Sequence, residues 1–176
     1  NLWLTVHVLT ITMSYGAFAL AWGLGHIVVF GYAFRKQTES LVSLANAVYR
    51  AIQIGVVLLA AGTVLGGVWA NYSWGRFWGW DPKETWALIA LLGYLIVLHG
   101  RFIGWFGSFG IAMGAVLAFM GVVMAWYGVN FVLAAGLHSY GFGGGGYSSV
   151  STVVLIDLAF VAAAAWFYRQ KQRALK

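Results

Sequence analysis

The protein is a chain of 176 residues, of which 62% are hydrophobic, 18% aromatic and only 8% charged. A soluble domain carries about a quarter charged residues, so this composition excludes a cytosolic enzyme, a disordered segment and a nucleic-acid-binding domain. The formal net charge of +6 arises from short basic clusters between apolar runs, as in the loops of membrane proteins. Because the chain has no Cys, disulfides and thiolate metal sites are excluded, and metal ligation would fall to His.

The fold class predicted from this pattern is an all-α polytopic membrane protein. A membrane helix needs about 20 mainly apolar residues, and five runs of this kind are present. They cover residues 4–34, 51–70, 85–100, 104–127 and 150–168.

A short amphipathic helix is expected in the membrane interface between the first two spans. Arg35, Lys36 and Glu39 interrupt the apolar pattern there. They are followed by apolar residues at helical spacing, namely Leu41, Leu44, Val48 and Ile52.

The distribution of Lys and Arg predicts the orientation, because positive loops stay in the cytoplasm. Arg76 and Lys83 fall on one side of the membrane. The other side receives Arg35, Lys36, Arg50, Arg101, Arg169, Lys171, Arg173 and Lys176. We therefore expect the C-terminus inside and the N-terminus, the 71–84 loop and the 128–149 segment outside.

Glycines within the spans indicate close helix packing. Gly62 with Gly66, and Gly110 with Gly114, are small-residue pairs, while Gly107, Gly114 and Gly121 repeat every seven residues. The run Gly143–Gly146 cannot be a helix interior, and we interpret it as a linker or a hinge.

The loop between the second and third spans holds five tryptophans within residues 69–86. An aromatic belt at the membrane surface explains two or three of them. Trp74, Trp78 and Trp80 lie among Gly75 and Gly79, and this mixture suits a large planar apolar ligand.

The end of this loop predicts a helix start. Asp81 is placed to cap the third span, Pro82 suits its first position, and Glu84 suits its first turn. The nearby cations Arg76 and Lys83 are either solvated or meet carboxylates of a ligand or partner.

The four histidines are the candidate metal ligands, since ionisable groups in spans are functional candidates. His7 and His138 are expected at the level of the Trp-rich loop, whereas His26 and His99 belong to the other half of the membrane. Two imidazoles on different helices can hold the metal of a planar ligand, which points to haem. The alternative is a hydrogen-bonded structural histidine, and we favour it for His26.

The stretch 74–86 resembles the tryptophan-rich WWD motif of the haem-handling proteins of cytochrome c biogenesis. Its ending, Asp-Pro-Lys-Glu-Thr-Trp, is similar to the CcsA (ResC) branch of system II, and less so to CcmC or CcmF of system I. The segments around His7, up to Tyr15, and around His138, up to Gly141, extend the resemblance to nearly the whole chain.

The resemblance implies that His7 and His138 are axial ligands of a haem b presented at the outer surface. It also implies that His99 serves an inner haem site, while His26 matches no family position, so that a ligand role for it depends only on its place in the span. The loop residues expected to bind the haem are Trp74, Gly75, Trp78, Trp80, Asp81 and Pro82.

The implied function is to move haem b across the membrane and present it for thioether attachment to the CxxCH segment of apocytochrome c. The chain would be a single haem-handling domain, residues 1–176, of a cytochrome c haem lyase or synthase. It would lack upstream spans and would work with a CcsB (ResB)-type membrane partner. The bilayer would be the bacterial cytoplasmic membrane or the thylakoid membrane.

Two alternatives stay open. One is a bis-His di-haem subunit that relays electrons across the membrane. The other is a haemless structural subunit or transporter with an interfacial Trp belt.

Overall fold

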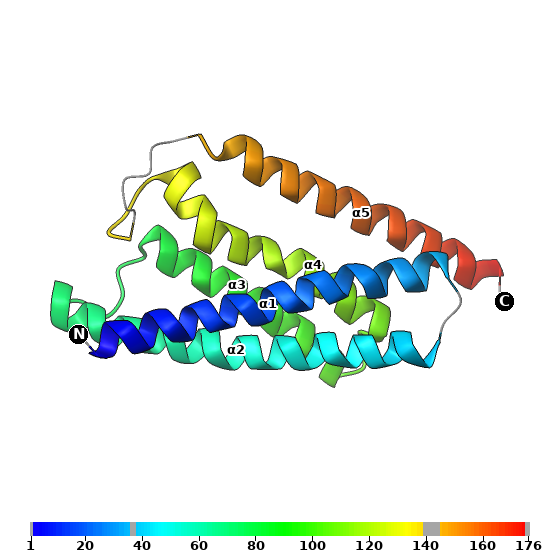
Figure 1. The fold of residues 1–176 in the computed structure, drawn as a ribbon, viewed down its shortest axis with the longest axis horizontal. Coiled ribbons are helices and arrows are strands. Elements are labelled where there is room, and N and C mark those ends of the chain that lie inside the picture. Colours follow the sequence, from blue (N-terminus) through cyan, green and yellow to red (C-terminus); the bar gives the residue numbers. More distant parts are fainter. Residues whose placement is uncertain (1, 36–37, 139–144, 175–176) are drawn as a thin grey trace.

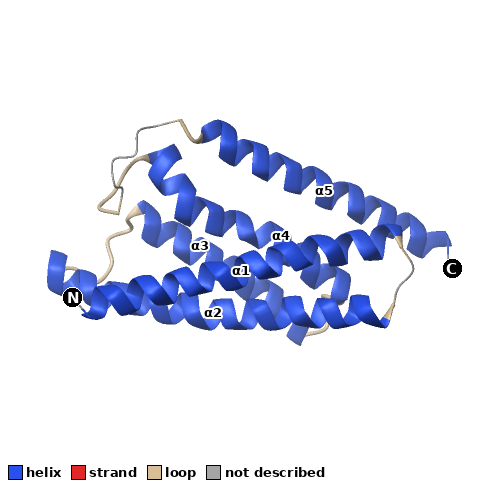
Figure 2. Cartoon of the chain, viewed as in Figure 1, coloured by secondary structure: helices blue, strands red, loops and turns tan. Residues whose placement is uncertain are grey.

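The computed structural model describes residues 2–35, 38–138 and 145–174. All regular structure in these ranges is helical (Figure 2). The elements are α1 (Leu2–Phe34), α2 (Glu39–Trp74), α3 (Pro82–Phe102), α4 (Ser108–Val123), η1 (Met124–Leu133) and α5 (Tyr147–Ala174). Five helices, counting α4 and η1 as one, are long and apolar enough to cross a membrane, which confirms the predicted fold class.

Helices α1 and α2 run side by side along the bundle (Figure 1). The ring of Phe18 from α1 lies against Gly55 of α2, where an added Cβ would be 2.5 Å from a ring carbon. The Phe18 ring also stacks on Tyr94 of α3, with ring centroids 3.8 Å apart. This aromatic pair, fully buried, joins three helices at the centre of the core.

The predicted amphipathic segment is not a separate helix. It forms the first turns of α2, which begins at Glu39 after the N-cap Thr38 and continues without a break into the span. Val48 and Ile52 are fully buried in the core instead of lying in the interface. The prediction of an interfacial helix was wrong because α1 extends far enough to cover this apolar face.

The fourth span changes its winding part of the way along. Regular α-helix ends at Val123, and the next ten residues form the π-helix η1, which ends at Leu133 and is followed by the C-cap Ala134 with a left-handed backbone. Gly121, near the junction, lies directly against Ala90 of α3. π-Helical segments are concentrated at functional sites, and this one leads to His138.

Helix α5 is the least enclosed of the five, and it diverges from α1 toward its start, where it packs on η1 (Figure 1). Its buried residues are Val150, Asp157, Val161 and Ala164. Near its end, the Lys171 ammonium donates hydrogen bonds to the carbonyl oxygens of Tyr32 and Arg35 at the end of α1. A cation at this position complements a helix C-terminus.

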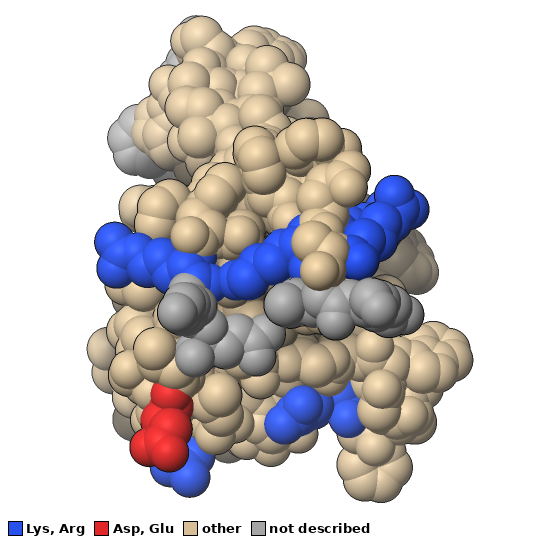
Figure 3. Space-filling model, turned by 90° about the vertical axis from the view of Figure 1, so that its right-hand side faces the viewer, with Lys and Arg blue, Asp and Glu red and all other residues tan. Residues whose placement is uncertain are grey.

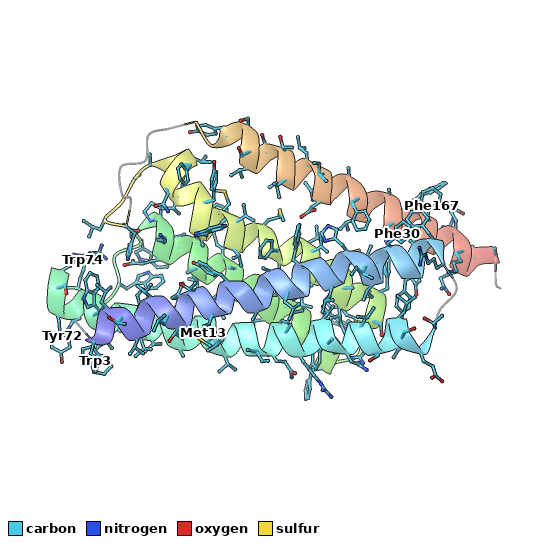
Figure 4. The ribbon with its side chains drawn as sticks, in the orientation of Figure 1. Trp3, Met13, Phe30, Tyr72, Trp74 and Phe167 are labelled. Carbon is cyan, nitrogen blue, oxygen red and sulfur yellow. The ribbon has the colours of Figure 1, made fainter. Side chains whose placement is uncertain are left out.

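The two ends of the bundle differ in character. The end that carries the Trp-rich loop, called the loop end below, holds Trp3, Tyr72 and Trp74 (Figure 4). The opposite end carries a band of Lys and Arg side chains and is called the basic end (Figure 3). This separation agrees with the uneven distribution of positive residues in the sequence. Lys36, Lys176, Gly143 and Gly144 lie outside the described residues.

Candidate haem-binding site at the loop end

A cavity of about 560 Å³ lies at the loop end between α1, α2, α3, the fourth span and the Trp-rich loop. Its wall is mainly apolar and aromatic, which is typical of small-molecule sites. His7 and His138 both line it, and these residues are 131 positions apart in the sequence. The remaining lining includes Tyr15, Thr63, Phe77, Trp78, Lys83 and Trp126.

His7 is held by the backbone of α2. Its Nδ1 lies 2.8 Å from the carbonyl oxygen of Gly62, to which it donates a hydrogen bond. The ring fits over Gly66, where an added Cβ would be 2.5 Å from the ring carbon Cε1. Because Nδ1 carries the proton in this bond, the lone pair of the neutral imidazole is on Nε2.

His138 is held by a carboxylate. Its Nδ1 lies 3.0 Å from Oδ1 of Asp81, and its ring lies edge-on to Trp74 with centroids 5.0 Å apart. A carboxylate that accepts from Nδ1 fixes the ring orientation and makes the other nitrogen a better metal ligand. Both histidines on this cavity therefore have Nδ1 bound to an oxygen, which leaves Nε2 for a metal.

Asp81 connects the loop, α3 and the segment before His138. It caps α3 by accepting from the Lys83 backbone N–H at 3.0 Å, and its second oxygen accepts from the Leu137 backbone N–H at 2.6 Å. Burial alone would raise the pKa of this carboxyl, but the hydrogen bonds from Lys83, His138 and Leu137 outweigh it and hold the pKa below its usual value. Asp81 is therefore an ionised acceptor at neutral pH.

The approach of residue 137 to Asp81 requires a glycine at position 136. Gly136 has φ +91°, and a Cβ there would be 2.3 Å from Oδ2 of Asp81. A side chain would thus push His138 away from its carboxylate.

Glu84 has the capping role that the sequence favoured. Its carboxylate accepts from the backbone N–H groups of Asp81 and Gly79, completing a capping box with Asp81. It also pairs with Arg76 at 3.3 Å. The two cations considered as ligand partners therefore differ, because Arg76 is held by Glu84, whereas Lys83 lines the cavity.

The loop glycines have local structural roles. Gly75 ends α2 with φ +70°, and its N–H donates to the Asn71 carbonyl. Beside Gly79, the place of a side chain is filled by the Arg76 guanidinium. The room at Gly79 thus serves the Arg76–Glu84 pair.

The three predicted loop tryptophans are placed differently. Trp78 lines the cavity. Trp74 lies behind His138 and also contacts Trp69, with ring centroids 4.8 Å apart. Trp80 is 69% exposed and has a left-handed backbone, and its ring lies edge-on to Trp78. Pro82 occupies the first turn of α3.

His99 lies apart from this cavity. It is exposed near the end of α3, and its Nδ1 donates to the Leu95 carbonyl at 2.7 Å. It does not line the cavity that His7 and His138 share. Its Nε2 is therefore available toward the outside of the bundle.

His26 belongs to a network that the sequence analysis missed. Its Nε2 is 3.0 Å from Oδ1 of Asp157, and its Nδ1 is 2.9 Å from the Trp22 carbonyl. Haem ligation by this residue would require one of these bonds to break. Asp157 has a clear sequence signal, since it is the one acid within the fifth apolar run.

The donor set at the loop end fits a metal that already has most of its ligands. Among the described residues, no group of three or more His, Cys, Asp or Glu could hold a bare metal ion. Two imidazoles on an apolar and aromatic cavity would suit a haem iron, because the macrocycle supplies its other four ligands.

The fold and this site define a class of protein, namely a polytopic helical membrane protein with two histidines presented to one aromatic cavity. Residues 1–138 match the model of the cytochrome C assembly protein family. The chain belongs to that family.

Individual relatives are also similar to this chain. The chain is 50% identical over 115 residues to the cytochrome c biogenesis protein CcsA of Cyanophora paradoxa, covering 62% of this chain and 35% of the relative. It is 38% identical over 170 residues to CcsA of Synechococcus sp. (strain RCC307), covering 79% and 54%. It is also 38% identical over 148 residues to Protein NrfI of Wolinella succinogenes, covering 80% and 16%. The chain thus spans from about a sixth to about half of these relatives' lengths.

Proposed function

We propose that the chain receives haem b as cargo and holds it at the loop end between His7 and His138, ready for attachment to apocytochrome c. The observation that carries this proposal is the shared cavity, on which each histidine has its Nδ1 bound to an oxygen acceptor. The outer haem would lie against Trp78 and Phe77, and Trp74 and Asp81 would support His138 from behind. Lys83 lines the same wall, where its positive charge would attract an acidic substituent of the cargo.

The arrangement supports delivery as well as binding. His138 lies in a loop segment after η1, not within a span, and among the described residues its ring contacts Asp81 and Trp74. A histidine from the acceptor can replace such a ligand more easily than His7, which is part of α1. In the attachment itself, each thiol of the acceptor adds across a vinyl group of the haem to form a thioether. This chain would hold the haem in position for that reaction.

An inner haem site would use His99. Because this side chain faces outward, the second ligand there would come from another chain, and a CcsB (ResB)-type membrane protein is the proposed source. The lipid bilayer and apocytochrome c are the other proposed partners. With the basic end in the cytoplasm, cargo would pass from His99 toward the loop end outside, in the bacterial cytoplasmic membrane or the thylakoid membrane.

The test is an optical spectrum of the purified chain after loading with haem b, followed by addition of an apocytochrome peptide with a CxxCH segment. Conversion of a b-type to a c-type pyridine haemochrome is the expected result. A b-type spectrum that never converts, even with the partner chain present, would favour the electron-relay alternative. Absence of haem binding in every preparation would contradict the proposal.

A further inference from the structure

A second polar cluster lies within the membrane-spanning part of the bundle, away from the haem cavity. Asp157 of α5 is 3% exposed and is flanked by apolar residues on both sides in sequence. Its Oδ2 accepts from the indole N–H of Trp22 at 2.8 Å, and its Oδ1 lies 3.0 Å from Nε2 of His26. The ring of Phe160 stacks on His26 with centroids 4.9 Å apart, which shields the pair.

The hydrogen bonds determine where the protons are. Nδ1 of His26 faces a carbonyl oxygen, which only accepts, so Nδ1 must carry a proton. Nε2 faces a carboxylate oxygen, and a hydrogen bond between these two atoms requires one more proton on either of them. The pair then has zero net charge, either as imidazolium with carboxylate or as imidazole with carboxylic acid. An apolar membrane interior favours this neutral total.

The pair has an opening on one side only. The His26 side chain is 27% exposed, whereas that of Asp157 is 4% exposed. His26 lines a second cavity of about 690 Å³, which extends to Arg35, Thr38 and Ser40 at the basic end. His26 is therefore the contact between the buried acid and this cavity.

We propose that His26 and Asp157 form a proton-binding site in the membrane interior, which holds one proton between Nε2 and Oδ1 and exchanges it with the basic end through this cavity. Arg35 is the other ionisable group on the cavity wall among the described residues, and α1, α4 and α5 otherwise present Trp22, Phe119 and Phe160 to the cluster. The proposal is independent of haem binding at His7 and His138.

The first measurement asks whether the His26–Asp157 pair holds this proton at pH 7, in the full chain in lipid nanodiscs. Nitrogen-15 NMR of labelled histidine, assigned with His26→Gln, reports an imidazolium, and infrared spectroscopy reports a protonated carboxyl that Asp157→Asn removes. We expect one of these two signals from the wild-type chain. The absence of both, meaning a neutral imidazole beside an ionised Asp157, would overturn the proposal.

Asp157→Asn gives a second test. Since Nδ1 keeps its proton, the amide of the new side chain can donate to Nε2, so His26 of this variant should be a neutral imidazole at pH 7. Glu39→Gln, at an exposed acid of the basic end, is the matched control and should leave the His26 signal unchanged. An imidazolium that persists in Asp157→Asn would contradict the shared proton. If Asp157→Asn does not fold, the wild-type spectra above decide the question.

The route is tested by blocking the cavity. Ser40→Trp places a large side chain on the cavity wall, and Ser43→Trp, on an exposed position that does not line it, is the control. We expect Ser40→Trp to lose the solvent exchange of the His26 proton seen in the wild-type chain, while Ser43→Trp keeps it. Unchanged exchange in Ser40→Trp would exclude this cavity as the route.

Discussion

At the scale of single residues, the haem-binding proposal depends on how each imidazole is oriented. His7 and His138 reach the same cavity from opposite parts of the chain, and they are oriented by different groups, a backbone carbonyl and a carboxylate. In both cases the partner selects the tautomer whose Nε2 can bind a metal. Each orientation also depends on a glycine. An added Cβ at Gly66 would collide with the His7 ring, and one at Gly136 would collide with the Asp81 carboxylate that holds His138.

Gly66→Ala should weaken haem binding because the new methyl group would occupy the place of the His7 ring. We expect the affinity for haem b to fall about tenfold or more, which is typical for disturbing the support of a metal ligand. The measurement is a Soret-band titration. Gly23→Ala, in a position with open space around its Cβ, is the control and should bind haem as the wild-type chain does.

Asp81→Asn should also weaken haem binding, by about 10- to 100-fold, because His138 loses its ionised acceptor. The control is Glu39→Gln, which removes an acidic charge at the other end of the bundle and should leave the Soret-band titration with haem b unchanged. An unchanged affinity in Asp81→Asn would show that this contact does not support the ligand.

The lowered pKa of Asp81 also predicts a pH dependence for the stability of the haem-free chain. A carboxyl whose pKa is lower in the folded state stabilises the fold at pH values above its unfolded pKa. The contribution of Asp81 should thus be complete above about pH 5 and be lost as the pH falls through the lowered pKa. Thermal unfolding measured across this range should show a smaller acid loss in Asp81→Asn than in the wild-type chain.

At the scale of elements, the apolar runs predicted all five spans, because a membrane helix is defined by length and composition. They did not predict that residues 41–52 continue α2, since an apolar stripe looks the same whether it faces lipid or another helix. The π-helix η1 also has no signature in hydropathy. The same limit applies to the His26–Asp157 contact, which depends on how α5 packs on α1.

Gly121→Ala tests the packing of the fourth span on α3. The added Cβ would be 2.9 Å from the Cα of Ala90, so one helix must move. We expect a loss of about 1–3 kcal/mol in the free energy of unfolding, seen as a lower Tm in detergent. Gly93→Ala, where the nearest atom would be at an ordinary 3.6 Å, should keep or raise the Tm.

At the scale of the whole molecule, the loop end and the basic end differ in structure. The loop end presents the cavity with His7 and His138, and the basic end closes α5 onto α1 through Lys171. The WWD resemblance pointed to His7 and His138, which line one cavity in the structure, while their role as haem ligands stays a prediction. The sequence could not show that Arg76 forms an ion pair with Glu84. Nor could it show that Trp74 contacts the His138 ring instead of lining the cavity.

The proposed orientation can be tested because the chain has no natural Cys. Tyr72→Cys is at an exposed position of the loop end, and Phe102→Cys at an exposed position at the end of α3. A membrane-impermeant maleimide added to intact cells or spheroplasts should label the first variant, and label the second only after permeabilisation. The reverse pattern would place the loop end and its cavity in the cytoplasm.

The most direct test of the central claim is the ligation of haem iron in His7→Gly and His138→Gly. The wild-type chain loaded with ferric haem b should give the low-spin electron paramagnetic resonance spectrum of two axial imidazoles. Each variant should lose this spectrum and recover it when free imidazole is added, because the ligand then occupies the vacated place. A bis-imidazole spectrum that persists in both variants without added imidazole would contradict haem binding between His7 and His138.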